Sequence, residues 1–241
     1  AARGRWPRSE GPDVEAPQKV PTPGVTTIAE LAQFLGIEPY QTGKAVLCSA
    51  SFSARAERPV AAFVRGDLEV NLEKLRRAVG ARELRPLGRE EVDALGLSPG
   101  SVGPLGLPSE QVLVVVDRSL GSVPSVAVGA NEQEHHLTGV ALERDLKPAL
   151  PGGLFDVDVA DVGPGSPCPT CGALLGAAAG FEVGRLQQRD AAHGAALGFE
   201  YLEEDGKPRS PAMASYAIGV ERVMASVVEA HHDDHGPIWP I

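Results

Sequence analysis

Short, wholly apolar runs constrain the fold of this chain more than any other feature of its sequence. Ala45–Cys48, Val60–Val64 and Val112–Val116 each contain four or five consecutive apolar residues. Runs of this length, bounded by turn signals, are typical of buried strands. Segments with helical periodicity, Glu69–Val79 and Arg89–Leu95, lie between them without a strict βαβ alternation. This mixture predicts an α+β (mixed α/β) fold, and 28 glycines with 21 prolines in 241 residues predict short elements joined by turns.

Local capping signals mark the ends of the predicted helices. Thr27 and Glu30 form a capping-box pattern, and Gly36 supplies a stop, so a helix is predicted between them. Asp67 is the candidate N-cap of the helix at Glu69–Val79. Further strands are predicted at 125–128, 136–142 and 155–162, a hairpin at 199–206, and a helix at 218–230 whose valines and methionine face mostly inward.

Changes in composition divide the chain into three parts. Residues 1–21 are rich in proline, glycine and charge, with little periodicity, which predicts a linker or arm. Residues 22–163 carry most of the predicted strands and form the first predicted domain. The run Gly163–Pro167 reads as a connection, so residues 164–241 form a second predicted part. The chain begins with Ala1, which is consistent with a start inside a longer protein.

Charge and cysteine content limit the classes of function. A net charge of -10 argues against nucleic-acid binding through bulk positive charge, so any such contact must be local. Three cysteines, Cys48, Cys168 and Cys171, suggest a reducing compartment rather than a disulfide framework. No apolar run reaches the roughly 18 residues of a membrane span, so no membrane partner is expected.

Candidate chemical residues lie at strand edges and in a glycine-rich loop: Lys44, the loop Gly100–Pro104, Asp117 and His136. A cationic amine beside exposed backbone amides suits phosphate binding or polarisation of an ester carbonyl. Each residue also has a simpler structural interpretation. Lys44 is then solvated at a strand start, the loop is a turn, Asp117 caps a turn, and His136 is a hydrogen-bonded surface histidine. The spacing does not indicate a Ser-His-Asp arrangement.

Three further motifs leave alternatives open. Arg65 either closes a tight turn or, with Lys74, lines a rim that contacts phosphates. Cys168-x-x-Cys171 resembles half of a tetrahedral zinc site, but the chain has no second cysteine pair, so no metal is expected. The run His231–His235 follows a predicted helix and is interpreted as a solvated helix end.

The order and spacing of many segments resemble the bacterial-type prolyl-tRNA synthetases from about residue 20 to the end. The matching segments are Thr22–Gly24, Thr27–Leu31, Lys44, Arg65–Asn71, Gly100–Pro104, Val116–Arg118, Gly129–Asn131, His136, Arg144–Asp145, Gly180–Gly184, Ala217–Arg222 and Ile238–Pro240. Each segment alone is weak evidence, whereas the ordered set is specific for the family.

The resemblance implies both a layout and an activity. Residues 22–163 correspond to an editing domain similar to the YbaK-type deacylases, inserted into a class II catalytic core. Residues 164–241 correspond to the return of that antiparallel-sheet core, including its motif 3. The implied reactions are hydrolysis of alanine from mischarged tRNA(Pro), without a cofactor, and attachment of proline to tRNA(Pro) by the parent with ATP and Mg²⁺. The resemblance also implies a cytoplasmic protein and a homodimer formed through the full-length core.

The same resemblance assigns roles to individual residues in the editing region. Lys44 matches a lysine that contacts the tRNA 3′ end. Gly100, Gly103 and Pro104 belong to the matching substrate-binding loop. His136 matches a pocket residue that helps to position the aminoacyl group.

Four more positions are expected to bind substrates. By the resemblance, Asp117 and Arg65 belong to the editing pocket and its rim. Glu182 is expected to bind substrate in the synthetase part, and Arg222 matches an arginine that contacts ATP.

Two segments depart from the family pattern. Arg185–Asp190 stands where the family has His-x-Phe-x-Leu-Gly, and Ala214–Ser215 and Ala217 replace Gly-Cys and Gly. We therefore expect no proline activation by this chain alone. The alternative is a decayed paralogue that binds tRNA or protein without catalysis. Exposed apolar strand edges in residues 164–241 would also predict aggregation.

Overall fold

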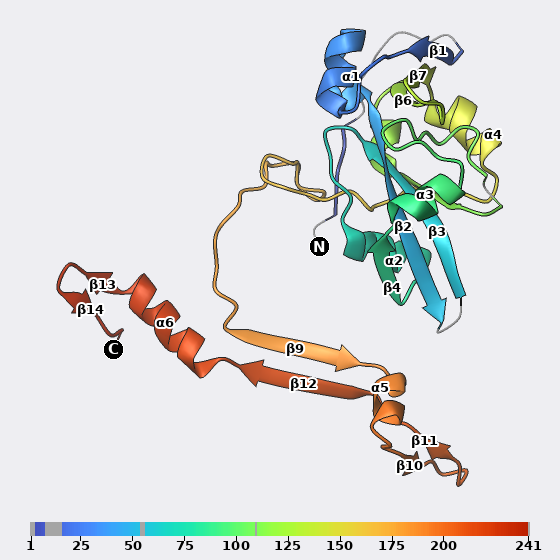
Figure 1. Cartoon of the computed structure of the whole chain (residues 1–241). Coiled ribbons are helices and arrows are strands. Elements are labelled where there is room, and N and C mark those ends of the chain that lie inside the picture. The colour runs from blue at the N-terminus through green and yellow to red at the C-terminus, as the bar shows by residue number, and fades with distance from the viewer. Residues whose placement is uncertain (1–2, 8–15, 54–55, 109, 241) are drawn as a thin grey trace. The chain divides into compact units, whose positions relative to one another are not determined.

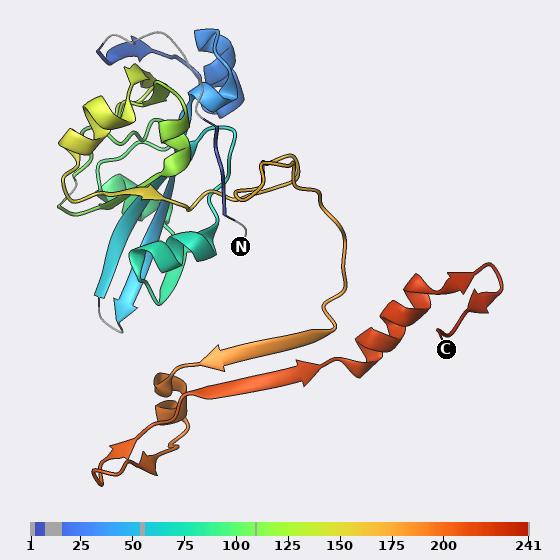
Figure 2. The same cartoon turned by 180° about the vertical axis from the view of Figure 1, so that it is seen from behind.

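The computed structural model describes residues 3–7, 16–53, 56–108 and 110–240. It divides into two compact units, Ala1–Ala177 and Ala178–Ile241, shown from two sides in Figures 1 and 2. The predicted mixture of helices and strands is confirmed. Each unit is described separately below, and the predicted domain border at residue 163 stays a prediction.

A five-stranded sheet forms the centre of the first unit. Its order is β4 (Glu83–Pro86), β2 (Gly43–Ser53), β3 (Ala56–Arg65), β5 (Leu113–Asp117) and β8 (Leu154–Val157). Strand β2 pairs antiparallel with β3 and β4, whereas β5 pairs parallel with β3 and β8. The three apolar runs therefore form adjacent central strands, as the sequence predicts.

Both faces of this sheet are buried. Along β3, Ala61 and Phe63 join one hydrophobic cluster, and Val60, Ala62 and Val64 join the other. Helix α2 (Leu72–Val79) contributes Leu75 to the second cluster, and α3 (Arg89–Ala94) contributes Val92 to the first. Burial of alternate side chains on both faces explains why the strand is a continuous apolar run instead of an alternating one.

A three-stranded antiparallel sheet and helix α1 complete the part of this unit that carries the site. The sheet order is β1 (Gln18–Pro21), β7 (His135–Val140) and β6 (Val126–Gly129). Helix α1 (Ile28–Leu35) has the predicted capping box and ends at Gly36, which is left-handed at φ 66°. Residues 18–21 lie in the predicted linker, but they form β1 because their backbone pairs with β7.

Short helical turns connect the remaining strands of the first unit. They are the 3-10 helices Pro39–Gln41 and Arg118–Ser122, the π-helical turn Leu142–Leu146 and α4 (Lys147–Ala149).

Two local predictions in this unit were wrong. The helix expected at Glu69–Val79 begins at Leu72, because Asn71 and not Asp67 is its N-cap. The Asn71 side chain accepts a hydrogen bond from the Lys74 amide, whereas Asp67 pairs with Arg65. The strand expected at 155–162 ends at Val157, and Ala160 forms only an isolated bridge with Val70.

The second unit has small pieces of sheet and little core. Its elements are β9 (Gly184–Arg189), α5 (Ala191–Ala196), β10 (Tyr201–Leu202), β11 (Pro208–Arg209), β12 (Met213–Ile218), α6 (Val220–Ala230), β13 (His232–Asp233) and β14 (Gly236–Pro237). Strands β9 and β12 form an antiparallel pair, and β10 pairs with β11 as the predicted hairpin.

The prediction that one side of α6 faces inward was wrong. No α6 side chain is buried, and Val220 and Met224 are 73% and 57% exposed. A two-stranded sheet offers too little surface to cover an amphipathic helix. Among the described residues, no helix is long and apolar enough to cross a membrane.

Candidate functional site

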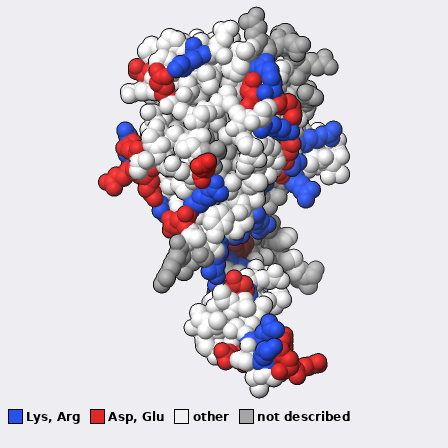
Figure 3. Space-filling view, turned by 90° about the vertical axis from the view of Figure 1, so that its right-hand side faces the viewer, with Lys and Arg blue, Asp and Glu red and all other residues white. Residues whose placement is uncertain are grey.

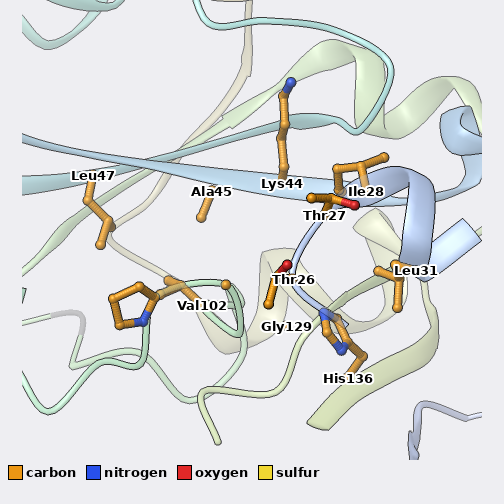
Figure 4. A pocket seen from close by; sticks show the side chains of 13 residues that line it. Thr26, Thr27, Ile28, Leu31, Lys44, Ala45, Leu47, Val102, Gly129 and His136 are labelled. Carbon is orange, nitrogen blue, oxygen red and sulfur yellow. The ribbon is translucent and has the colours of Figure 1, made fainter. Parts of the chain in front are cut away.

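A pocket of about 390 Å³ lies where helix α1, strand β2 and the loop before residue 103 meet. Its lining is mainly apolar and comes from segments far apart in the sequence: Thr26–Ile28, Leu31, Gly43–Ala45, Leu47, Pro99, Gly100, Val102, Gly129 and His136 (Figure 4). The pocket thus brings together Lys44, Gly100 and His136, three of the candidate residues. A small apolar cavity with a few polar groups is typical of a ligand site.

Strand β2 contributes to this site from both of its faces. Figure 4 shows the side chains of Ala45 and Leu47 on one side of the strand and that of Lys44 on the other. The Lys44 ammonium forms an ion pair with Glu69, whose side chain is 78% exposed. Because an exposed ion pair is weak, this contact leaves Lys44 able to exchange Glu69 for a stronger anion.

His136 is buried beside the pocket, so the alternative interpretation of this residue as a surface histidine was wrong. The residue is only 4% exposed, because β7 lies between β1 and β6. Its Nδ1 lies 2.6 Å from the Thr22 hydroxyl, and the ring also hydrogen-bonds the Gly100 backbone carbonyl. Burial lowers the pKa of His136 below its usual value. A neutral ring that donates to Gly100 and accepts from Thr22 satisfies both contacts.

The Gly100–Pro104 loop is held in place by Asn131, a residue given no role by the sequence reasoning. Its Oδ1 accepts a hydrogen bond from the Gly103 amide at 2.9 Å. Its Nδ2 donates to the carbonyls of Gly103 and Leu105 at 3.0 and 2.7 Å. Asn131 itself is left-handed, with φ 54°, a conformation that asparagine adopts more readily than most residues.

Close backbone packing explains the glycine at position 103. A Cβ atom there would lie 1.6 Å from the carbonyl oxygen of Gly129, so no side chain fits without movement of the loop or of β6. The loop is therefore packed directly against the end of β6.

Two amides of this loop remain available at the pocket. The Ser101 amide donates to Ser98, and the Gly103 amide donates to Asn131. Within the described residues, the Gly100 and Val102 amides donate to no protein acceptor, and both residues line the pocket. These N–H groups can stabilise negative charge on an oxygen bound there.

Asp117 does not line the pocket. It is fully buried, and its carboxylate accepts backbone hydrogen bonds from Ser119, Val159 and Ala160 at 2.7, 2.6 and 2.8 Å. These contacts fix the turn after β5 and the segment after β8. The structural interpretation of Asp117 therefore accounts for all of its observed contacts.

Arg65 also lies outside the pocket lining. Its guanidinium pairs with Asp67 through two hydrogen bonds, at 2.6 and 2.8 Å, and lies over the rings of Trp6 and Tyr40. A guanidinium stacked and paired in this way is fixed in place. The contacts match the tight-turn interpretation of Arg65.

In the second unit, Glu182 and Arg222 lie together. Nη1 of Arg222 is 3.4 Å from the Glu182 carboxylate, which also pairs with Arg185 at 2.9 Å. These groups are at least half exposed. The site expected in the synthetase part thus has two of its residues adjacent within this unit.

The two segments that depart from the family pattern are neighbours in the structure. In the β9–β12 pair, Arg185 lies opposite Ala217, and Gln187 and Gln188 lie opposite Ser215 and Ala214. They form one altered two-stranded surface instead of two separate changes.

No metal site accompanies these groups in the part of the chain that the structure describes. No cluster of three or more His, Cys, Asp or Glu side chains has a metal-binding arrangement there. Cys168 and Cys171 therefore have no third ligand nearby, and the histidines after α6 do not gather around one point.

Comparison with known proteins identifies the family. The sequence profile of the aminoacyl-tRNA editing domain matches residues 22–146, which include every residue that lines the pocket. The chain belongs to the aminoacyl-tRNA editing domain family. The match covers the predicted editing region from its first residue.

The similarity to known relatives extends beyond the editing domain. The chain is 39% identical to a proline--tRNA ligase of Desulforamulus reducens over 92% of its own length. It is 36% identical to the proline--tRNA ligase of Nautilia profundicola over its entire length. It spans 37% and 41% of those two relatives. The resemblance to prolyl-tRNA synthetases inferred from the motifs is thereby confirmed for both parts of the chain.

A solved structure supports the fold of the first unit. The crystal structure of a hypothetical protein matches 61% of this chain and 92% of its own, with a TM-score of 0.52 and 26% identity.

The surface charge agrees with a local mode of recognition. On the face visible in Figure 3, basic and acidic side chains are interspersed, without an extended area of one sign. A polyanion bound here would therefore depend on a few placed groups.

Proposed function

We propose that residues 22–163 hydrolyse the ester that links alanine to the 3′ end of mischarged tRNA(Pro). The observation that carries this proposal is the pocket beside His136, lined by Gly100 and Val102, whose amides donate to no acceptor among the described residues. Membership of the editing-domain family supplies the substrate class, an aminoacyl-tRNA.

The chemistry of proline selection supplies the reason for removing alanine. A pocket built for proline gains only about 1–3 kcal/mol from the methylenes that alanine lacks, so it admits alanine at a measurable rate. A second, smaller pocket corrects this error. The apolar side chains of Ala45, Leu47 and Val102 line the site, and we assign to them the surface on which the methyl group of alanine packs.

A water molecule is the proposed nucleophile. The threonine hydroxyls of the lining are engaged in the α1 cap, and no cysteine, serine or carboxylate lines the pocket among the described residues. Water attacks the ester carbon, and the Gly100 and Val102 amides stabilise the oxyanion. The ribose oxygen then leaves with a proton that the water provided, with help from the neighbouring ribose hydroxyl. The products are alanine and uncharged tRNA.

Lys44 has a positioning role in this scheme. Its side chain lies on the opposite side of β2 from Ala45 and Leu47, and its ammonium forms an ion pair with the exposed Glu69. We assign it to a phosphate near the tRNA 3′ end, which would replace Glu69. His136 would hold the loop through the Gly100 carbonyl and not transfer a proton.

Deacylation of Ala-tRNA(Pro) tests the proposal, with Pro-tRNA(Pro) and the Lys44→Ala variant as controls. Selective loss of alanine that requires Lys44 is expected. Hydrolysis of both esters at similar rates would refute the assigned selectivity, and full activity of Lys44→Ala would refute the role of Lys44. An inactive but folded chain should be retested together with the longer protein, because tRNA binding could require the synthetase body.

For the longer protein, we propose attachment of proline to tRNA(Pro) with ATP and Mg²⁺. ATP supplies the free energy for forming the ester. The Arg222 guanidinium fits this use, since it is 66% exposed and its planar donors suit phosphate oxygens. Glu182 would orient Arg222 and contact substrate. ATP–pyrophosphate exchange dependent on proline, measured on the longer protein and its Arg222→Ala variant, tests this second reaction.

The remaining parts of this proposal concern assembly and compartment. The exposed apolar side chains of β12 and α6, such as Tyr216, Ile218 and Val220, would be covered by the other strands of the synthetase core. Dimerisation through that core and a cytoplasmic location, where tRNA is charged, complete the proposal.

A further inference from the structure

A second chemically distinctive feature lies in the first unit, away from the pocket residues. Residues 165–175 form a small hairpin, here called the dithiol hairpin, closed by a bridge between Pro167 and Leu174. The Cys168 amide donates to Ala173 at 2.8 Å, and the Gly172 amide donates back to Cys168 at 2.9 Å. Gly172 has φ 79°, which lets the chain reverse directly after Cys171. The turn thereby places both thiols on one short segment.

The Cys168 sulfur is surrounded by hydrogen-bond donors. Backbone amides of Cys171 and Thr170 point to it, and the Cys171 thiol and Thr170 hydroxyl add weaker contacts. These donors lower the pKa of Cys168 to about 7. Arg5 approaches the same turn, and its Nη1 lies 3.6 Å from the position that a Cβ on Gly172 would occupy. The environment of Cys168 therefore favours its thiolate.

Accessibility distinguishes this pair from the third cysteine. Cys171 is exposed and Cys168 is partly exposed, whereas Cys48 is fully buried in β2. Burial raises the pKa of Cys48. Since no third metal ligand accompanies Cys168 and Cys171 among the described residues, a pair of thiols is the chemistry that the hairpin offers.

We propose that Cys168 and Cys171 form a redox-active dithiol, in which Cys168 attacks a low-molecular-weight disulfide such as glutathione disulfide and Cys171 resolves the product. In the first step the Cys168 thiolate bonds to one glutathione sulfur, and the other glutathione leaves as its thiolate. In the second step the Cys171 thiolate attacks Cys168 and releases the second glutathione. The two cysteines are oxidised to a disulfide, and one glutathione disulfide is reduced to two thiols.

The test treats the full chain with glutathione disulfide at pH 7 and maps its cysteines by peptide mass spectrometry. The expected product is an intramolecular Cys168–Cys171 disulfide, with Cys48 remaining a free thiol as the internal control. The Cys171→Ser variant should accumulate one glutathione, on Cys168. It should react roughly three- to fourfold faster than a small thiol of ordinary pKa, because a larger thiolate fraction outweighs a lower intrinsic nucleophilicity.

Three results would overturn the proposal. One is a stable glutathione adduct on the unmodified chain, which would show that Cys171 does not resolve it. Another is equal reactivity of Cys171→Ser and Cys168→Ser, which would remove the distinct role of Cys168. The third is zinc that copurifies with the chain and protects both thiols from alkylation, which would identify a metal half-site completed by ligands from elsewhere.

Discussion

Replacement of Asn131 by glycine should loosen the Gly100–Pro104 loop and leave the rest of the fold unchanged. Glycine tolerates the left-handed φ of 54° and keeps the backbone hydrogen bond from residue 131 to Ser101. It removes the three side-chain hydrogen bonds to Gly103 and Leu105. The substitution therefore tests those hydrogen bonds without backbone strain.

The size of the effect follows from these bonds. Each contributes about 0.5–1.5 kcal/mol, so roughly 1.5–4.5 kcal/mol of loop stabilisation is lost. At about 1.4 kcal/mol per factor of ten, a mid-range loss lowers the equilibrium constant for ordering the loop by about 100-fold. Because the Gly100 and Val102 amides act only when the loop is in place, the deacylation rate of Ala-tRNA(Pro) should fall by up to the same factor.

Single-turnover deacylation and thermal unfolding, measured on the same samples, provide the assay. Asn131→Ala should be slower still, since alanine adds the cost of a left-handed conformation. Glu132→Gln is the matched control next in sequence, and it loses surface charge contacts with Lys19 and His135, so its rate should stay within about twofold of the unchanged chain. A folded Asn131→Gly protein that deacylates within about threefold of the unchanged chain would refute the proposed role of the loop.

Three other perturbations test separate parts of the site. Glu69→Gln should strengthen tRNA binding by up to about fivefold at low salt by releasing Lys44, and the gain should vanish when Lys44→Ala is also present. The lowered pKa of His136 means that, below 6.5, the unfolded chain takes up a proton before the folded chain does. This contribution to stability is therefore complete above pH 6.5 and is lost as the pH falls below that value. In urea titrations, a His136→Gln variant should lose this pH dependence of the free energy of unfolding. An unchanged pH profile in the variant would contradict the assignment of the effect to His136. Gly103→Ala should lower the free energy of unfolding by about 1–3 kcal/mol through its clash with β6. Gly152→Ala is the control, because Gly152 has open space around it and its replacement should have no such effect. Equal melting temperatures of the two variants would show that the loop shifts freely.

The elements that the sequence predicted best are those with a local physical cause. The apolar run Val60–Val64 predicts a buried strand because both of its faces need cover, and the structure places a hydrophobic cluster on each face. The capping box of α1 is also local, since Thr27 and Glu30 need only each other's backbone. Here the hydrogen bonds that the Glu30 carboxylate accepts from Thr26 and Thr27 lower its pKa to about 2.

The features that the sequence could not predict depend on contacts between distant segments. The burial of His136 follows from the pairing of β1 with β7, which joins residues more than 100 positions apart. Asn131 stood in a matching segment, but its role arises only when the loop packs on β6. Asp67 and Asn71 were equally good candidate caps by residue type, and the ion pair of Asp67 with Arg65 decided between them. An asparagine two residues after a glycine that ends an apolar run, as in Gly129-Ala130-Asn131, is a sequence signal that could have drawn attention to Asn131.

The two segments that depart from the family pattern have a larger expected effect on the longer protein together, as one β9–β12 surface, than either has alone. Opposite positions in an antiparallel pair contact each other, so a change on one strand alters the surroundings of its partner. Because Arg185 faces Ala217, and Gln187 and Gln188 face Ser215 and Ala214, the replaced residues alter one continuous surface. Glu182 and Arg222 lie beside this pair and keep their mutual contact. We therefore expect the longer protein to retain the nucleotide contact proposed for Arg222, while its binding of proline is weakened. ATP binding together with weakened proline-dependent ATP–pyrophosphate exchange is the expected result. ATP–pyrophosphate exchange that saturates at ordinary proline concentrations would contradict it.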